Sequence, residues 1–129
     1  MKDLKEAAFA LLRVGAGVFF LCHGGQKLFS WFGGMPGGMV IAPMSKFWFA
    51  GVIELVGGAA IALGLFTRPV AFLCSGEMAV AYFTTHLPKG VLPIQNGGEA
   101  AALYSLLFLY ISARGAGGFS LDSRMKRSG

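Results

Sequence analysis

The chain has 129 residues, of which 55% are hydrophobic and only 13% charged, and its mean hydropathy is +0.65. A soluble domain of this length needs many more charged side chains on its surface, so the composition indicates an integral membrane protein. The formal net charge is +5, but the basic residues flank the apolar runs and form no basic stripe. The lipid bilayer is therefore the expected partner, and nucleic acid is not.

Four apolar runs have the length of a membrane-spanning helix, at about residues 7–29, 47–66, 69–87 and 97–113. Asp3 and Glu6 precede the first run, which is longer than the apolar part of a signal peptide, so we expect this helix to be retained. Residues 67–69 alone separate the second and third runs, and Pro69 suits the first turn of a helix. These runs predict a single all-α domain over residues 1–129, an integral membrane four-helix antiparallel bundle.

Basic residues are distributed unequally between the two ends of this bundle. The end that holds both termini has eight of them, and the opposite end has Lys27, Lys46 and Lys89. The positive-inside rule then predicts that both termini face the cytoplasm. Trp31 and Trp48 flank the first external loop, where aromatic residues of the membrane interface are expected.

Three glutamates, Glu54, Glu77 and Glu99, each interrupt a different apolar run. A carboxylate within the bilayer must be neutralised, paired or hydrated, which makes each of them a candidate functional residue. The predicted topology places all three in the outer half of the membrane, together with the other polar residues of the spans. We expect an outward-opening polar pocket whose ligand-binding residues are His23, Lys27, Glu54, Glu77, His86 and Glu99, with Glu54, Glu77 and His23 as catalytic candidates. The alternative is structural, with Glu54 and Glu77 paired to Lys27, His23 or Arg13 so that they hold the helices in register.

Helical periodicity predicts which face of each span points inward. Glycines on these faces would let the helix backbones approach one another. The four predicted inward faces are Arg13, Gly17, Phe20, Gly24 and Lys27; Gly51, Glu54, Gly58, Ile61 and Leu65; Glu77, Ala81 and Thr85; and Glu99, Leu103, Leu106 and Tyr110.

No metal or haem motif is visible in the sequence. His23 is better explained as a hydrogen-bonded core histidine and His86 as an interfacial one, with haem ligation a less favoured alternative. Met35, Met39 and Met44 contain the soft sulfur that Cu(I) prefers, but apolar loop packing explains them better. Cys22 and Cys74 should differ by more than about 10 Å in depth and cannot form a disulfide.

The assembled residues resemble those of the DoxX family of small bacterial and archaeal membrane proteins over nearly the whole chain. The resemblance implies a multi-pass protein of the cell (inner) membrane that is associated with oxidoreductase systems, including quinone-linked ones. The matching elements, in family order, are Arg13 with residues 23–29; residues 54–58; residues 64–68; Glu77 and Ala81; His86; residues 96–99; and residues 115–122.

From the residues and the resemblance together we expect a membrane subunit of a redox system that binds a quinone-like ligand in the outer pocket. Carboxyl and imidazole groups can hydrogen-bond a quinone and relay protons. Electrons would come from a redox partner subunit or from a cofactor with no sequence signature. The alternative is a non-enzymatic scaffold or a small transporter, and the glycine-rich faces would permit a homo-oligomer.

Overall fold

The computed structural model describes residues 2–128, with side chains described for residues 3–126. Every regular element in this part of the chain is helical. The long helices are α1 (Lys2–Phe29), α2 (Lys46–Leu63), α3 (Thr67–Ala81) and α5 (Glu99–Arg114), and α3 continues through a π-helical turn, η3 (Tyr82–His86). The short elements are η1 (Trp31–Gly33), η2 (Pro36–Gly38), η4 (Leu87–Lys89), α4 (Pro93–Asn96) and the C-terminal α6 (Leu121–Ser128).

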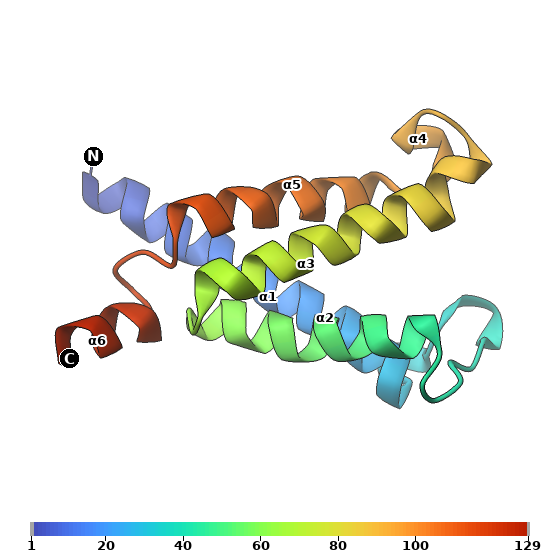
Figure 1. The fold of residues 1–129 in the computed structure, drawn as a ribbon, viewed down its shortest axis with the longest axis horizontal. Coiled ribbons are helices and arrows are strands. Elements are labelled where there is room, and N and C mark those ends of the chain that lie inside the picture. The colour runs from blue at the N-terminus through green and yellow to red at the C-terminus, as the bar shows by residue number, and fades with distance from the viewer. Residues whose placement is uncertain (1, 129) are drawn as a thin grey trace.

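Successive long helices run in opposite directions, and both ends of the chain lie at the same end of the molecule (Figure 1). Helix α1 packs along α2, α3 packs along α5, and α2 joins the two pairs by contacting α3. Aromatic side chains also link α1 to α5, with the rings of Phe20 and Phe108 4.8 Å apart. We call the end with the α2–α3 turn and α6 the terminal end, and the end with residues 30–45 and 87–98 the loop end.

The helix boundaries differ from those predicted in ways that local chemistry explains. Helix α2 ends at Leu63 rather than at residue 66, because Gly64 adopts the left-handed conformation (φ 70°) that terminates a helix. Helix α3 therefore begins at Thr67, two residues earlier than predicted, with Pro69 in its first turn as expected. Helix α6 was not predicted.

Glycines bring the backbones of α1 and α2 into direct contact. A Cβ atom added to Gly24 would lie 2.3 Å from the backbone nitrogen of Leu55, and one added to Gly17 would lie 2.7 Å from the carbonyl oxygen of Gly58. Only glycine permits this approach, so the predicted inward faces of α1 and α2 are confirmed. Most of each face is buried, including Phe20 and Ile61, and Lys27 and Leu65 are partly buried.

The predicted inward face of α5 is wrong. Leu103, Leu106 and Tyr110 are 54–65% exposed and Glu99 is also exposed. The buried face of α5 instead contains Ala101, Phe108 and Ile111. Because α5 is apolar on all sides, the helical period of its sequence does not identify the face that points inward. Glu99 lies in the first turn of the helix, where a carboxylate is favourable without being buried.

Several polar groups are buried inside the molecule, and many large apolar side chains lie on its exterior. Arg13 and Glu54 are at most 2% exposed, whereas Leu11, Phe19, Phe72 and many other large apolar residues are more than 60% exposed. Such an exterior is unfavourable in water and favourable in lipid. Two helices, Asp3–Phe29 and Lys46–Leu63, are long and apolar enough to cross a membrane. Helices α3 and α5 have 15 and 16 residues, and α3 gains length from η3.

Candidate functional site

The candidate site is a cluster of charged side chains between α1, α2 and α3. Lys27, in the last turn of α1, donates a 2.7 Å hydrogen bond to Glu54 of α2, and the two side chains are 15% and 2% exposed. Gly24 and Gly51 make this pairing possible, since the close approach of α1 and α2 brings the lysine over the carboxylate. One of the structural pairings expected from the sequence is thereby confirmed.

Glu77 of α3 lies beside Glu54, close enough for a hydrogen bond between the two carboxyl groups. Two carboxyl groups can share such a bond only when one of them holds a proton, because an ionised carboxylate has no donor. The Oε1 atom of Glu77 is buried and has no hydrogen-bond partner within the described residues. A buried acceptor that lacks a donor is costly, so this oxygen is suited to receive a hydrogen bond from a ligand.

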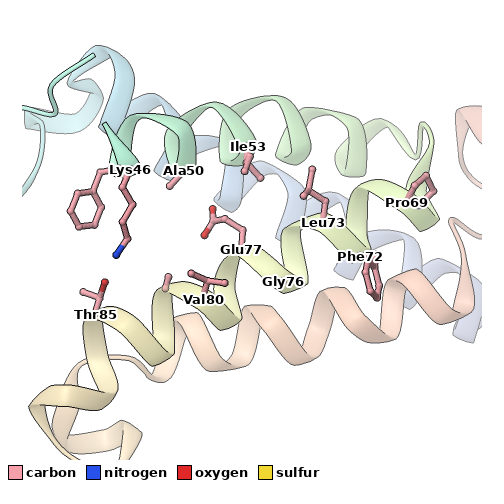
Figure 2. Close-up of a pocket in the computed structure, with 12 residues that line it drawn as sticks. Lys46, Ala50, Ile53, Pro69, Phe72, Leu73, Gly76, Glu77, Val80 and Thr85 are labelled. Atoms are coloured by element: carbon pink, nitrogen blue, oxygen red, sulfur yellow. The ribbon is translucent and has the colours of Figure 1, made fainter. Parts of the chain in front are cut away.

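Glu77 points into a groove of about 510 Å³ between α2 and α3 (Figure 2). The groove is almost entirely apolar, with Ala50, Ile53 and Leu73 near its middle. Lys46 and Thr85 lie at its loop end, and Pro69 lies at its terminal end. An apolar groove with a few polar groups is the usual form of a small-molecule site. Sequence reasoning missed Lys46 here because it assigned this residue only to the external loop.

His23 is exposed on α1, beside the buried face that Gly24 and Lys27 share. Its ring packs edge-on against Tyr104 of α5, with centroids 6.0 Å apart, and the charges of Lys27 and Glu54 act on it. The prediction of a hydrogen-bonded core histidine is therefore wrong, because position 23 lies just off the face that packs on α2. Tyr104 was missed because an aromatic residue in an apolar run gives no distinguishing signal.

His86 and Glu99 lie outside this cluster. His86 ends the π-helical turn, and its Nδ1 atom lies 3.4 Å from the carbonyl oxygen of Asn96. The buried Asn96 side chain donates to the Tyr82 hydroxyl and to the Gly90 carbonyl, which fixes the loop before α5. Glu99 is exposed in the first turn of α5. The structure thus brings together Lys27, Glu54 and Glu77, with His23 near them. The other two predicted site residues, His86 and Glu99, lie apart from this cluster.

Arg13 pairs with neither Glu54 nor Glu77. Its buried guanidinium donates to carbonyl oxygens at the end of α2 and in the segment after α5, including those of Ile61 (3.0 Å) and Phe119 (2.8 Å). Arg13 therefore fastens the terminal end rather than contributing to the candidate site.

Ser75 of α3 and Ser105 of α5 exchange hydrogen bonds, and the hydroxyl group of each serine donates to the other's backbone carbonyl. Both serines interrupt apolar runs, a signal from which sequence reasoning could have found them.

Cys22 and Cys74 are both free thiols, as predicted, and Cys74 is fully buried. The described residues contain no group of three or more histidine, cysteine or acidic side chains placed to hold a metal ion.

Comparison with known proteins gives related sequences and no matching solved structure. An uncharacterized protein of Haemophilus influenzae is 48% identical over 118 residues, covering 89% of this chain and 88% of the relative. A Bacillus subtilis protein named "Putative oxidoreductase CatD" is 30% identical over 122 residues, covering 91% and 86%. The sequence model of the DoxX family matches residues 8–87, which include most of α1, all of α2 and α3, and all the charged residues of the candidate site. The chain therefore belongs to the DoxX family of membrane proteins.

Proposed function

We propose that this chain is a multi-pass subunit of a redox system in a bacterial or archaeal cell membrane, and that it binds a quinone-like ligand in the groove between α2 and α3. The observation that carries this proposal is that Glu77 lines an apolar groove of about 510 Å³ and has a buried Oε1 atom with no hydrogen-bond partner among the described residues. The apolar walls suit a ring or an isoprenoid tail, and the carboxyl oxygen can accept a hydrogen bond from a quinol hydroxyl. The name of the Bacillus subtilis relative supports the redox assignment.

The groove is placed for a ligand that is dissolved in the membrane. Phe72, Leu73 and Val80 line it and are 55–67% exposed, so it lies on the apolar exterior rather than in a closed core. A lipid-soluble ligand would reach it laterally from the bilayer. The chain itself would hold the ligand and exchange protons through the Glu54–Glu77 pair, and a redox partner subunit would supply or remove electrons.

We also propose that both termini face the cytoplasm. Arg13, Arg68 and Arg114 all lie toward the terminal end, and the positive-inside rule then assigns this end to the cytoplasmic side. A fluorescent protein fused to the C-terminus should therefore fluoresce in cells. A periplasmic reporter that is active at the same position would contradict this orientation.

The test of ligand binding uses the purified full chain in lipid nanodiscs and a short-chain ubiquinol, with affinity measured by calorimetry. Glu77→Leu should weaken binding about tenfold, since it removes the hydrogen-bond acceptor that the carboxyl group offers to the quinol. Glu99→Leu is the matched control, because this exposed carboxyl group lies away from the groove, and it should leave the affinity unchanged. Equal affinities for Glu77→Leu and the unmodified protein, with both folded, would reject the proposed site.

A scaffold role is the second candidate function, and the Lys27–Glu54 pair favours it, because this pair can act solely as a fastener between α1 and α2. A protein with this role would bind no ubiquinol. Its mass in detergent would then show whether it assembles with itself, and uptake assays in vesicles would test for transport.

A further inference from the structure

A second pocket, of about 580 Å³, lies at the terminal end and plays no part in the proposed redox site. The α2–α3 turn, the end of α5 with the segment after it, and α6 line this pocket. Its charged lining residues are Arg68, Arg114, Lys126 and Asp122, and Gly117 and Gly118 form part of its wall. We propose that this pocket binds a phosphate group, carried either by an anionic lipid headgroup or by a free phosphate compound.

The two arginines are held in place by contacts that leave some of their donors available. Arg68 donates to the last carbonyl groups of α5, including that of Arg114 at 3.2 Å. Arg114 uses one terminal nitrogen for Glu6, at 2.9 Å, and its guanidinium carbon lies 3.8 Å from the centre of the Phe9 ring. A guanidinium group has five N–H donors in a fixed plane, so both side chains can still offer hydrogen bonds to phosphate oxygens.

The carboxylates near the pocket are already engaged. Both oxygens of Asp122 accept backbone N–H groups, from Phe66 at 2.7 Å and from Thr67 at 2.9 Å, and Glu6 accepts from Arg114. Three cations face two carboxylates, and Lys126 is exposed on α6. The pocket therefore has an excess of positive charge, and Lys126 is the cation least committed to the fold.

The surroundings place this pocket at the level of lipid headgroups. Phe119, Leu121 and Met125 are 37–65% exposed next to the basic residues of α6, a pattern typical of a helix that lies in the membrane interface. Basic pockets at the ends of membrane helices are suited to anionic headgroups. Gly118 is exposed, and a Cβ atom added there would meet nothing within 4 Å, so the pocket has room for a further side chain.

The experiment measures binding of phosphatidylglycerol and phosphatidylcholine to the purified full chain in detergent by native mass spectrometry. Lys126→Gln should weaken phosphatidylglycerol binding about fivefold, the effect of one cation near an anionic membrane surface. Gly118→Lys adds a cation at the open position and should strengthen binding by a similar factor. Lys89→Gln, at the loop end, is the matched control and should have no effect.

Inorganic phosphate distinguishes the two sources of the group. Displacement of phosphatidylglycerol by millimolar phosphate would identify a site that also accepts free phosphate compounds, and persistence of the lipid would identify a headgroup site. The proposal is overturned if Lys126→Gln and Gly118→Lys both bind phosphatidylglycerol as the unmodified protein does. It is also overturned if Lys89→Gln weakens binding as much as Lys126→Gln. Both altered positions are exposed, so thermal unfolding should match that of the unmodified protein and exclude misfolding as the cause.

Discussion

The Lys27, Glu54 and Glu77 cluster leads to a prediction about how these residues share one positive charge. The Lys27 ammonium lies 2.7 Å from Glu54, and its charge also acts on Glu77. Coulomb's law with an effective dielectric constant of about 20 gives roughly 6 kcal/mol of attraction between Lys27 and Glu54, before the cost of removing both groups from water is subtracted. Removing Glu54 alone would leave Glu77 as a replacement partner for the lysine, because the second carboxyl group is adjacent.

Glu54→Gln should therefore reduce the free energy of unfolding by only about 1–2 kcal/mol, and Glu77→Gln by less than about 1 kcal/mol. The double variant leaves the Lys27 ammonium without a carboxylate in a largely buried position and should lose about 3–5 kcal/mol. At the middle of these ranges the two substitutions would interact by about 2 kcal/mol, beyond the usual additivity of independent sites.

Equilibrium unfolding in mixed micelles titrated with a denaturing detergent measures these differences in stability. Glu99→Gln, an exposed carboxyl group, should change the free energy of unfolding by less than about 0.5 kcal/mol and serves as the control. If the loss in the double variant equals the sum of the two single losses within about 0.5 kcal/mol, Lys27 does not exchange partners and the shared-charge reasoning is wrong.

Three further predictions concern packing, pH and accessibility. Gly24→Ala should destabilise the protein by about 1–3 kcal/mol or more in the same assay, because its Cβ would collide with the α2 backbone, whereas Gly15→Ala has open space and should be neutral or stabilising. Burial raises the pKa of Asp122, but backbone N–H groups and the charge of Arg13 outweigh it and hold this pKa below its usual range. The stability that Asp122 provides is thus fully present above about pH 3.9, the pKa of this group in the unfolded chain, and is lost as the pH falls through the lower pKa of the folded protein. Asp122→Asn should reduce the free energy of unfolding by about 0.5–2 kcal/mol at pH 7, and by less in acid. Maleimide should label the half-buried Cys22 in the folded protein and leave the fully buried Cys74 unlabelled until denaturation, and equal labelling rates would contradict the packing of α3.

Much of the candidate site could be predicted because an ionisable residue in an apolar run has few acceptable positions. Glu54 and Glu77 had to find partners inside the protein, and glycines at intervals of seven residues on α1 and α2 indicated where two backbones meet. The pairing of Lys27 with Glu54 then required only that the two helices be antiparallel. His23 could not be placed in this way, because a shift of one position around a helix turns a side chain by about 100° and moves it from a buried face to an exposed one.

Helix α5 shows the limit of the same reasoning. Its residues are apolar on all sides, so no period in the sequence distinguishes the side that meets α1 and α3 from the side that meets lipid. Contacts between separate helices made that choice, through the Phe20–Phe108 rings and the Ser75–Ser105 hydrogen bonds.

The sequence by itself determined that the chain is a helical membrane protein, because hydropathy and run length are local properties of the chain, and its match to the DoxX family model showed the family. The tertiary structure alone decided that Arg13 secures the terminal end, that Glu99 and His86 lie apart from the site, and that Glu77 lines an apolar groove and has a buried oxygen without a hydrogen-bond partner among the described residues. These features depend on distances between residues far apart in the chain, which the packing of α1, α2, α3 and α5 sets and which no local pattern specifies.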